Sequence, residues 1–372
     1  MGSISKSESF MESPMKNVTM KDIAEKLGIS VVSVSNALSY KNGVSEEIRR
    51  KVMETAEELG YRYNSAERES RDIGTRSVGV LIPERFLGTY EAFYWHIYNK
   101  LFKKLSQYGY FGILEILTAE AERKLIPPSI LNTNAAKGII VLGQMNQRYV
   151  ELLDKSEKPM ILLDFYNDRS CYDTITTDNF YNSYRITNYL IEYGHRNIGF
   201  VGNIHATSSI LDRYLGCCKS LIEHSIPIRR DWLIPDRDEE GRPVELELPE
   251  EMPTAFVCNC DEMAYKMIER LKAAGLCVPA DVSVVGFDNH IYSKISNPQI
   301  TTIKVDSEAM TAVCAGSIIK KIENPGYRAG RSVIMGDMVI RDSVAKIDDS
   351  RAGVKRNKEK TERENSIQEV LR

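Results

Sequence analysis

The sequence predicts two structural parts, a small all-α unit of three helices and a larger α/β region of two lobes with parallel sheets. Between residues 18 and 60, apolar residues recur at the spacing of amphipathic helices. From residue 77 onward, short β-rich runs alternate with helical patterns, which is typical of a parallel sheet covered by helices. This alternation occurs in two sets, from about 77 to 175 and from about 195 to 300, and 372 residues suffice for both parts.

The first and third helices of the small unit carry clear start and stop signals. Thr19 is a candidate N-cap of the first helix, and Gly28 ends it. Its expected apolar face comprises Met20, Ile23, Ala24 and Leu27. Ser45 is a candidate N-cap of the third helix, whose first turn holds two acids that the helix dipole favours. Its expected core stripe comprises Ile48, Val52, Ala56 and Leu59, before Gly60.

The segment between these helices, GISVVSVSNAL at residues 28–38, has an ambiguous local pattern. Valine alternates with serine and β-branched residues dominate, which favours a strand. A helix that starts after Ser30 instead places Val34, Ala37 and Leu38 together on one face. Because a strand here has no visible hairpin partner, we expect tertiary context to override local propensity and this segment to be a helix.

Three short helices with a glycine turn between the first two form a helix-turn-helix unit. The run VTMKDIAEKLGISVVSVSNAL, continued by VSEEIRRKVMETAEELGYRYN, resembles the DNA-binding headpiece of the lactose-repressor (LacI/GalR) family, without a gap from Val18 to Asn64. The resemblance implies that residues 18–63 form a headpiece that binds double-stranded operator DNA, with residues 31–38 in the major groove.

The α/β region resembles the effector-binding core of the same family. Its landmarks are YGHRNIGFVGN, DRYLGCCKSL, the run from AFVCNCDEMAY to SVVGFDN, and PQITTIKVD. The resemblance implies a two-lobed, periplasmic-binding-protein-like core over residues 77–342 that dimerises and binds a small molecule between its lobes. Residues 1–17 are then a mobile leader, 64–76 a hinge or linker, and 343–372 a charged tail, expected to be disordered or a loose helix rather than a leucine zipper.

In the second helix, Val31, Val32 and Asn36 match the positions with which the family reads base edges. An amide can pair with N6 and N7 of adenine, whereas valine can only contact the methyl group of thymine. We therefore expect methyl groups and one adenine to specify the operator more than guanine does; the alternative is a merely solvated face. Contacts to DNA phosphates are expected from Thr19, Ser30, Ser33 and Ser35.

The charge of the headpiece is nearly balanced, because residues 16–62 hold eight Lys or Arg and seven Asp or Glu. One headpiece should bind weakly, so useful affinity requires two headpieces on a two-fold operator. In the family, a leucine of the hinge wedges into the minor groove. Here Ser70 stands at that position beside Glu67, and neither is an apolar wedge. Arg68 remains a candidate DNA contact, and a plain charged linker is the alternative.

The resemblance assigns the effector site to side chains from both lobes. Arg213 and Asp288 match a ligand-contacting arginine and aspartate, which together suit a sugar-like, polyhydroxyl ligand. An ion pair between the lobes or at the surface is the alternative for both residues. The other expected effector-binding residues are Phe93, Tyr94, Asp164 and Asp261. Cys260 replaces the asparagine usual in the family, and residues 230–256 lack an expected helix, so the effector is atypical or absent.

Composition and motifs exclude several other classes of protein. The sequence has no phosphate loop, GxSxG or HExxH motif, which argues against an enzyme, and we expect no cofactor. The seven cysteines lack metal-ligand spacing, so reduced thiols and no metal are expected, although Cys258, Cys260 and Asp261 form a weak candidate cluster. His195 is expected to be structural. Neither an apolar run long enough for a membrane span nor a secretion signal is present, which predicts a cytoplasmic protein.

Together these observations predict a cytoplasmic, homodimeric DNA-binding transcriptional regulator, a repressor in most members of the family. Its headpieces would read the half-sites of a pseudo-palindromic operator, and a small molecule would bias the closure of the lobes. The alternative is a solute-binding ligand sensor without a DNA function, which the headpiece and the lack of a signal peptide disfavour.

Overall fold

The computed structural model describes residues 18–38, 43–59, 61, 76–87, 91–132, 135–167, 172–238 and 241–347. The chain divides into two compact units, Met1–Ile73 and Gly74–Arg372. We call the first the headpiece and the second the core, and each is described by itself. Within the described residues, no helix has both the length and the apolar character needed to cross a membrane.

The headpiece is a bundle of three helices, α1 (Met20–Leu27), α2 (Val31–Leu38) and α3 (Glu46–Glu58). The helix predicted for the ambiguous segment is confirmed. Val34 is fully buried, whereas Val31 and Val32 are exposed, so burial follows the helical period and not the period of a strand. The buried side chains of the bundle are Ile23, Ala24, Val34, Ala37, Leu38, Val52 and Ala56.

Short polar contacts fix the ends of these helices. The backbone N–H of Ser33 donates to Ser30 Oγ at 3.0 Å, and that of Ile48 donates to Ser45 Oγ at 3.4 Å, as expected of N-caps. Gly28 ends α1 in the left-handed conformation, with a φ of 63°. One prediction for α3 was wrong. Ile48 is 37% exposed and lies at the rim of the bundle, because it stands in the first turn of α3.

Arg49 joins α3 to the C-terminal end of α2. Its Nη1 donates to the carbonyl oxygen of Ala37 at 3.1 Å, and that of Asn36 lies at 3.5 Å. Carbonyl groups in the last turn of a helix have no partner within the helix. The buried guanidinium satisfies them and thereby sets the position of α2 against the bundle.

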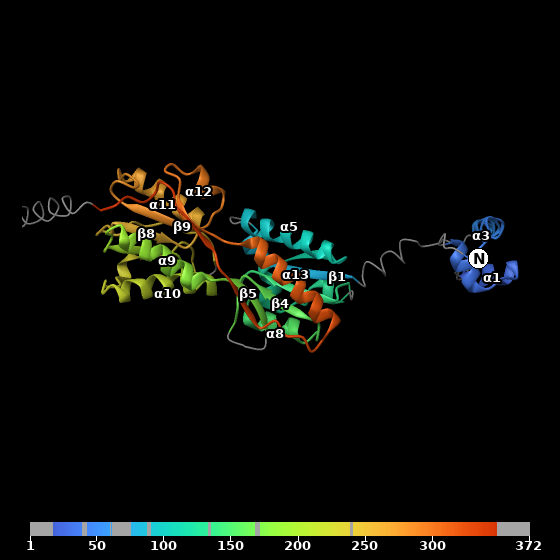
Figure 1. Cartoon of the computed structure of the whole chain (residues 1–372). Coiled ribbons are helices and arrows are strands. Elements are labelled where there is room, and N and C mark those ends of the chain that lie inside the picture. Colours follow the sequence, from blue (N-terminus) through green and yellow to red (C-terminus); the bar gives the residue numbers. More distant parts are fainter. Residues whose placement is uncertain are drawn as a thin grey trace, which may run out of the picture. The chain divides into compact units, whose positions relative to one another are not determined.

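The core contains two six-stranded sheets with helices on both faces (Figure 1). The first sheet has the order β11-β5-β4-β3-β1-β2, and all its strands are parallel. Its strands are β1 (Ser77–Pro83), β2 (Phe111–Leu117), β3 (Gly138–Leu142), β4 (Met160–Leu163), β5 (Asp173–Thr177) and β11 (Arg331–Ile334). The helices of this lobe are η1 (Glu84–Phe86), α5 (Glu91–Gln107), α6 (Ala119–Lys124), α7 (Ser129–Asn132), α8 (Gln147–Asp154) and α13 (Ser307–Glu323).

The second sheet has the order β12-β10-β9-β8-β6-β7, with β12 antiparallel to its neighbour. Its strands are β6 (Ile198–Val201), β7 (Leu233–Ile234), β8 (Ala255–Cys258), β9 (Ser283–Asp288), β10 (Thr301–Lys304) and β12 (Asp337–Val339). Its helices are α9 (Asn179–Glu192), α10 (Ser208–Glu223), η2 (Arg230–Trp232), α11 (Asp261–Ala273) and α12 (Ile291–Ile295). The described residues between β7 and β8 form no helix, as the sequence indicated.

Alternate side chains of the buried strands face two different cores. In β1, Val78 and Val80 pack with α5 and α13, whereas Leu81 packs with α7 and α8 on the other face. The second sheet repeats this arrangement, with α9 and α10 on one face and α11 on the other. A strand buried on both faces is apolar throughout, which is why the runs SVGVLI and KGIIVL signalled a parallel sheet.

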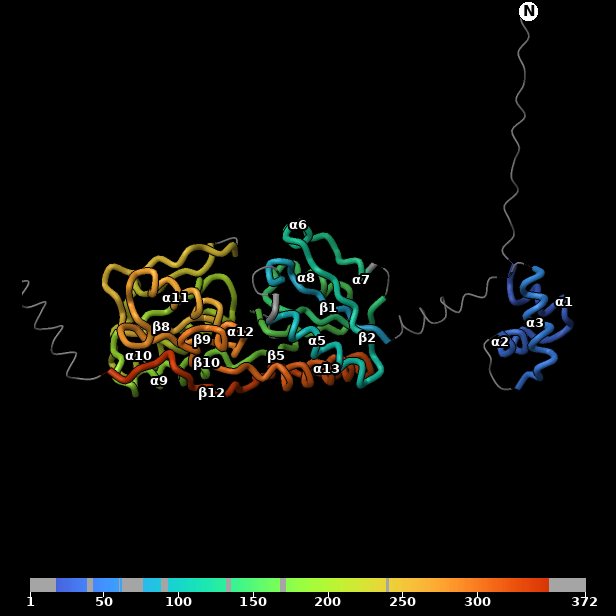
Figure 2. Tube along the Cα trace, turned by 90° about the horizontal axis from the view of Figure 1, so that it is seen from above, coloured from blue at the N-terminus to red at the C-terminus, as the bar shows by residue number. Residues whose placement is uncertain are grey.

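The chain passes between the lobes three times, which the sequence did not reveal. After β5 it enters the second lobe at α9, after β10 it returns to the first lobe at α13, and after β11 it returns to the second at β12. Helix α13 therefore lies beside α5 although about 200 residues separate them, as both views show (Figures 1 and 2). The expected extents of the lobes, about 77–175 and 195–300, omitted these returning segments.

Residues 343–347, which we assigned to the charged tail, lie against the second lobe. Ser343 is fully buried, and its hydroxyl donates to the carbonyl oxygen of Val284 at 2.5 Å. The backbone N–H of Ile347 donates to the carbonyl oxygen of Tyr193 at 2.8 Å. The ordered core thus extends beyond residue 342, and the prediction for residues 348–372 falls outside the described part of the chain.

Replacing Arg49 by Met should destabilise the headpiece by about 1–3 kcal/mol, because the carbonyl groups at the end of α2 lose their partner. Hydrogen exchange of the α2 amides in the full chain measures this change. Arg50→Met is the matched control, since the Arg50 side chain is 72% exposed on the same helix. Equal exchange in the two variants would contradict this role of Arg49.

Candidate functional site

The headpiece presents two adjacent valines on an otherwise packed helix. Val31 is 45% and Val32 is 67% exposed, and Asn36 is partly exposed one turn further along α2. Two adjacent exposed apolar side chains form a small apolar patch, which a binding partner can cover. This face offers one amide and a branched apolar surface, the combination that can contact adenine and a thymine methyl group.

The residues predicted to contact phosphates are partly engaged within the headpiece. Thr19 directs its backbone N–H and its hydroxyl to the Asp22 carboxylate, at 2.6 and 2.7 Å. A phosphate would have to replace that carboxylate, which weakens the assignment of Thr19. Ser30 Oγ lies 2.9 Å from Ser33 Oγ at the start of α2, where free backbone N–H groups favour an anion. Arg68, Glu67 and Ser70 lie outside the described residues.

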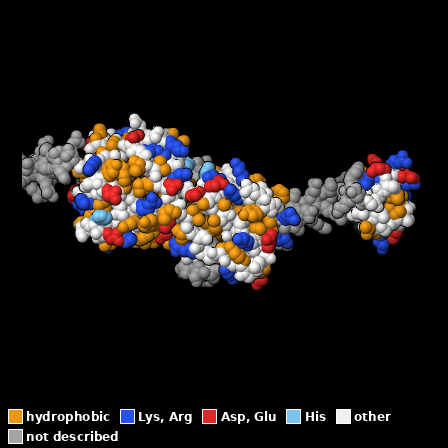
Figure 3. Space-filling view, viewed as in Figure 1, with side chains coloured by type: hydrophobic (Ala, Val, Ile, Leu, Met, Phe, Trp, Pro, Cys, Tyr) orange, Lys and Arg blue, Asp and Glu red, His pale blue; other side chains and the backbone are white. Residues whose placement is uncertain are grey.

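Charges of both signs alternate on the headpiece. Lys26 pairs with Glu58 at 2.9 Å and Lys51 with Glu47 at 3.0 Å. Acidic and basic side chains are accordingly mixed on the face that Figure 3 shows. The surface therefore carries no strong single-sign field, which agrees with the expectation of weak binding by one headpiece.

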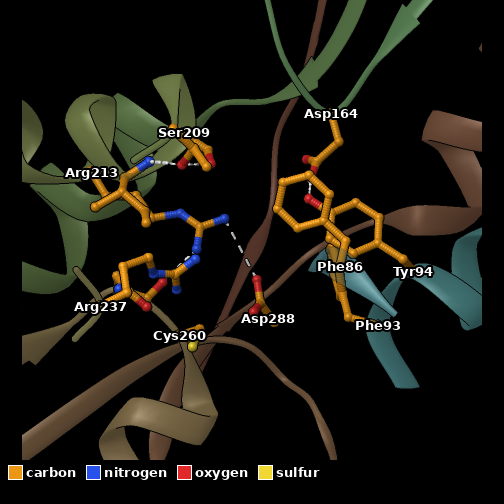
Figure 4. A pocket seen from close by; sticks show the side chains of 12 residues that line it. Phe86, Phe93, Tyr94, Asp164, Ser209, Arg213, Arg237, Cys260 and Asp288 are labelled. Atoms are coloured by element: carbon orange, nitrogen blue, oxygen red, sulfur yellow. Dashed lines mark hydrogen bonds and ion pairs between the residues drawn. The ribbon is translucent and has the colours of Figure 1, made fainter. Parts of the chain in front are cut away.

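A pocket lies between the two lobes of the core, at the carboxyl ends of the parallel strands, where α/β proteins commonly bind ligands (Figure 4). Its empty space is about 480 Å³, including open solvent. It is lined by Phe86, Phe93, Tyr94, Asp164, Thr207, Ser209, Ile210, Arg213, Arg237, Asn259, Cys260 and Asp288.

The strand ends explain why these side chains converge. In the first lobe, Phe86 follows β1 and Asp164 follows β4, while Phe93 and Tyr94 belong to the first turn of α5. In the second lobe, the residues after β7, β8 and β9 and the first turns of α10 supply the rest of the lining. Of the six predicted effector-binding residues, the structure brings five together: Phe93, Tyr94, Asp164, Arg213 and Asp288.

Arg213 is one of two buried arginines that line the pocket. Its Nε donates to Asn179 Oδ1 at 2.8 Å, Nη1 donates to the carbonyl oxygen of Asn259, and its Cζ lies 3.8 Å from the centre of the Phe287 ring. Its Nη2 lies 3.6 Å from Asp288 Oδ1. Arg213 and Asp288 thus form an ion pair between themselves, and both also line the pocket.

Two carboxyl groups face this guanidinium. Tyr94 Oη donates to Asp164 Oδ2 at 2.9 Å, and Asp288 Oδ1 is buried without a hydrogen bond. Burial raises the pKa of Asp164 to about 6 and that of Asp288 to about 7, although Arg213 opposes both shifts. Both residues stand at positive φ, 68° for Asp164 and 104° for Asp288, a backbone strain typical of functional positions.

Asp261 does not line the pocket, contrary to our prediction. Its side chain is fully buried at the start of α11, where Oδ1 accepts from the Thr302 hydroxyl at 2.5 Å and Oδ2 from the backbone N–H of His290 at 2.6 Å. The carboxylate thus ties α11 to the ends of β9 and β10. The preceding residue, Cys260, takes the place in the lining.

Sequence reasoning missed several lining residues, above all Arg237, Asn259 and Phe86. Each lies within three residues of the carboxyl end of a strand, so the rule that ligands bind at the carboxyl ends of parallel strands would have marked them. Arg237 also pairs with its neighbour Asp236, at 2.7 Å between Nη2 and Oδ2.

Two polar contacts join the lobes beside the pocket. Gln144 Oε1, after β3, accepts from the backbone N–H and the hydroxyl of Ser208 at 3.0 and 3.1 Å. Tyr166 Oη, after β4, donates to Asp212 Oδ1 at 2.7 Å. Both partners belong to α10, so this helix contacts the first lobe directly.

His195 has a structural environment. Its ring nitrogens lie 3.0 Å from the Thr254 hydroxyl and 3.1 Å from the carbonyl oxygen of Ala345, and burial lowers its pKa to about 4. The thiols of Cys258 and Cys260 are buried, which raises the pKa of both. In the part of the chain that the structure describes, no three His, Cys, Asp or Glu side chains are placed to hold a metal ion.

Comparison with known proteins gives consistent results for both units. Residues 19–64 match the model described as bacterial regulatory proteins, lacI family, and residues 187–344 match a periplasmic binding protein-like domain. The chain is 31% identical over 296 residues to the catabolite control protein A of Priestia megaterium, covering 77% of this chain and 87% of that protein. It is 27% identical over 335 residues to the transcriptional repressor PurR of Actinobacillus pleuropneumoniae serotype 3 (strain JL03), covering 88% and 98%.

A solved structure has the same fold. The chain is similar to a lac repressor dimer bound to operator and the anti-inducer ONPF, with a TM-score of 0.66 and 20% identity, covering 89% of this chain and 100% of that chain. This likeness confirms the predicted fold class, a helix-turn-helix headpiece and a two-lobed α/β core.

The raised pKa of Asp288 predicts that stability falls as pH rises. An ordinary aspartate loses its proton near 3.8, whereas burial keeps Asp288 protonated to about 7. The folded chain therefore binds more protons in this interval, and the stabilisation from that proton, complete below pH 4, is lost as pH rises through 7. Asp288→Asn should reduce the fall in unfolding free energy between pH 5 and 8 by about 2 kcal/mol. Urea unfolding measures this, with the exposed Asp337→Asn as control; parallel pH curves for wild type and Asp288→Asn would contradict it.

Proposed function

The chain belongs to the lacI family of bacterial regulatory proteins, and we propose that it is a homodimeric repressor that binds a pseudo-palindromic operator. As a member of this family it is a DNA-binding transcriptional regulator and not an enzyme. The observation that carries the proposal is the exposed face of Val31, Val32 and Asn36 on the second helix of a helix-turn-helix unit.

Two arguments support a dimer. The headpiece has mixed charge and a recognition helix of only eight residues, so one copy offers few phosphate and base contacts. Two copies on one operator contribute two sets of contacts, with the second binding step intramolecular. The structurally similar lac repressor is a dimer on its operator. A regulator that binds chromosomal DNA works in the cytoplasm, which is where we place this chain.

The pocket between the lobes is proposed as the site of a small effector, sugar-like in carrying hydroxyl groups. Phe93, Tyr94, Asp164, Arg213 and Asp288 supply aromatic surface, donors and acceptors from both lobes. A ligand that bridges them stabilises one relative position of the lobes and thereby shifts the affinity for the operator. For the headpiece, we propose Ser30, Ser33 and Ser35 as phosphate contacts and retain Thr19 and Arg68 as secondary candidates.

A solute-binding sensor without a DNA function is the second candidate, favoured by the match of residues 187–344 to a periplasmic binding protein-like domain. A gel-shift experiment with the DNA upstream of the chain's own gene separates the two functions. We expect a sequence-specific shift whose midpoint changes with metabolites. No specific shift in their presence or absence would leave the sensor as the better proposal.

Asn36→Ala should relax specificity at one base pair in each half-site by about 1–3 kcal/mol, because the amide that pairs with adenine is removed. Binding is measured against operators with each base pair changed in turn. Met53→Ala is the control, since Met53 is 40% exposed on α3 and lies outside the α2 surface. If Asn36→Ala weakens binding to every operator variant equally, Asn36 positions the headpiece and does not read a base.

A further inference from the structure

We propose that the pocket selects an effector that carries a protonated amine, such as an amino sugar or a polyhydroxylated amine, over neutral and phosphorylated sugars. The inference rests on the proposed function in placing the effector in this pocket, and it adds the chemical class of the ligand.

The charges that line the pocket do not balance. Arg237 donates to Asp236 Oδ2 from Nε and Nη2, at 3.1 and 2.7 Å, and Asp236 lies behind the lining and is 1% exposed. Arg237 is thus neutralised by its neighbour. Arg213 then remains as the one cation opposite Asp164 and Asp288 among the described residues that line the pocket. With both carboxyl groups ionised, the cavity has an excess of one negative charge.

The hydrogen-bonding groups are unbalanced in the same direction. Two nitrogens of Arg213 already donate hydrogen bonds, to Asn179 Oδ1 and to the carbonyl oxygen of Asn259. Asp288 Oδ1 is buried and accepts no hydrogen bond, and the nearest guanidinium nitrogen is 3.6 Å away. A ligand therefore meets an unfilled acceptor. An ammonium group has three donors and no acceptor, and so matches this cavity better than a hydroxyl group does.

Three aromatic rings form the wall opposite the arginines. The Tyr94 ring centre lies 5.0 Å from that of Phe86 and 5.2 Å from that of Phe93. Figure 4 shows these rings across the cavity from Arg213 and Arg237. Aromatic faces attract a desolvated cation as well as the apolar face of a sugar ring. Carboxylates beside aromatic faces are the surroundings that a buried ammonium group requires.

Backbone strain and protonation support the same ligand. Asp164 and Asp288 are the two lining residues at positive φ, so the fold holds both carboxyl groups in the cavity at an energetic cost. Their raised pKa values mean that the empty pocket relieves its excess charge by taking up protons near neutral pH. A bound ammonium group takes the place of those protons.

An anionic ligand is the competing possibility. The start of α10 offers the hydroxyl groups of Thr207 and Ser209 and the positive end of a helix dipole. However, Thr207 Oγ1 already accepts from the backbone N–H of Ile210 at 3.1 Å and lies 2.9 Å from Ser209 Oγ. A phosphate here would also lie in a cavity with two carboxyl groups.

The test compares the amine, hydroxyl and phosphate forms of the same carbon skeletons, using glucosamine, glucose and glucose 6-phosphate, and glucamine, sorbitol and sorbitol 6-phosphate. Calorimetric titration of the full chain measures each affinity at pH 8, where the amine of glucamine is protonated and that of glucosamine only partly so. We expect at least one amine to bind about tenfold more tightly than its hydroxyl and phosphate counterparts, since hydrogen bonds to charged groups are the stronger ones. The affinity of glucamine, which stays protonated throughout, should fall between pH 8 and pH 5.5 as Asp164 and Asp288 take up protons.

Asp288→Asn should abolish the preference for the amine, whereas Asp212→Asn should retain it, because Asp212 lies outside the lining and asparagine can still accept from Tyr166. Asp164→Asn provides a second variant if Asp288→Asn does not fold. The inference is overturned if no amine binds more tightly than its counterparts, including the case in which none of the six compounds binds, or if both pocket variants keep the preference. A gel shift without added compound reports on operator binding separately, so failure of the inference leaves the proposed function intact.

Discussion

The three passages of the chain between the lobes are the constraint on which the core depends. Each sheet takes one strand from the last part of the chain, because β11 pairs with β5 in the first lobe and β12 pairs with β10 in the second. The returning segment is anchored by the buried pair of Lys321 and Asp173, whose carboxylate also accepts from the backbone N–H of Gly330 at 2.7 Å. Three connections of the chain thus join the two lobes on either side of the pocket in which we propose that an effector binds.

The sequence predicted secondary structure best where the local residue pattern could be compared with the core that neighbouring helices form. Residues 31–38 have the alternation of a strand, but the helical face of Val34, Ala37 and Leu38 fits the core formed by its neighbours, and the structure has a helix there. The cap at Ser45 and the strands from SVGVLI to SVVGFD were predictable because they are properties of consecutive residues. The resemblance to a family then supplied five of the twelve residues that line the pocket.

The features that the sequence did not predict depend on the direction in which a side chain points and on contacts between residues far apart along the chain. The resemblance to the family suggested a ligand contact for Asp261, but at the first residue of a helix the side chain turns toward Thr302 and the His290 backbone. The packing of α13 on α5 joins residues about 200 positions apart, which no periodicity reports. Whether Arg237 is available to a ligand depends on Asp236 behind it, and only the structure shows that pairing.

The exposed valines of α2 bear on how operator binding depends on the methylation of its bases. A valine recognises the methyl group at C5 of a pyrimidine by contact alone and donates no hydrogen bond to the rest of the base. Cytosine methylated at C5 presents that same group at the same place in the major groove. If Val31 and Val32 contact thymine methyl groups, the headpiece should also respond to the methylation of cytosine, and enzymatic methylation of an operator would then change its affinity without changing its sequence.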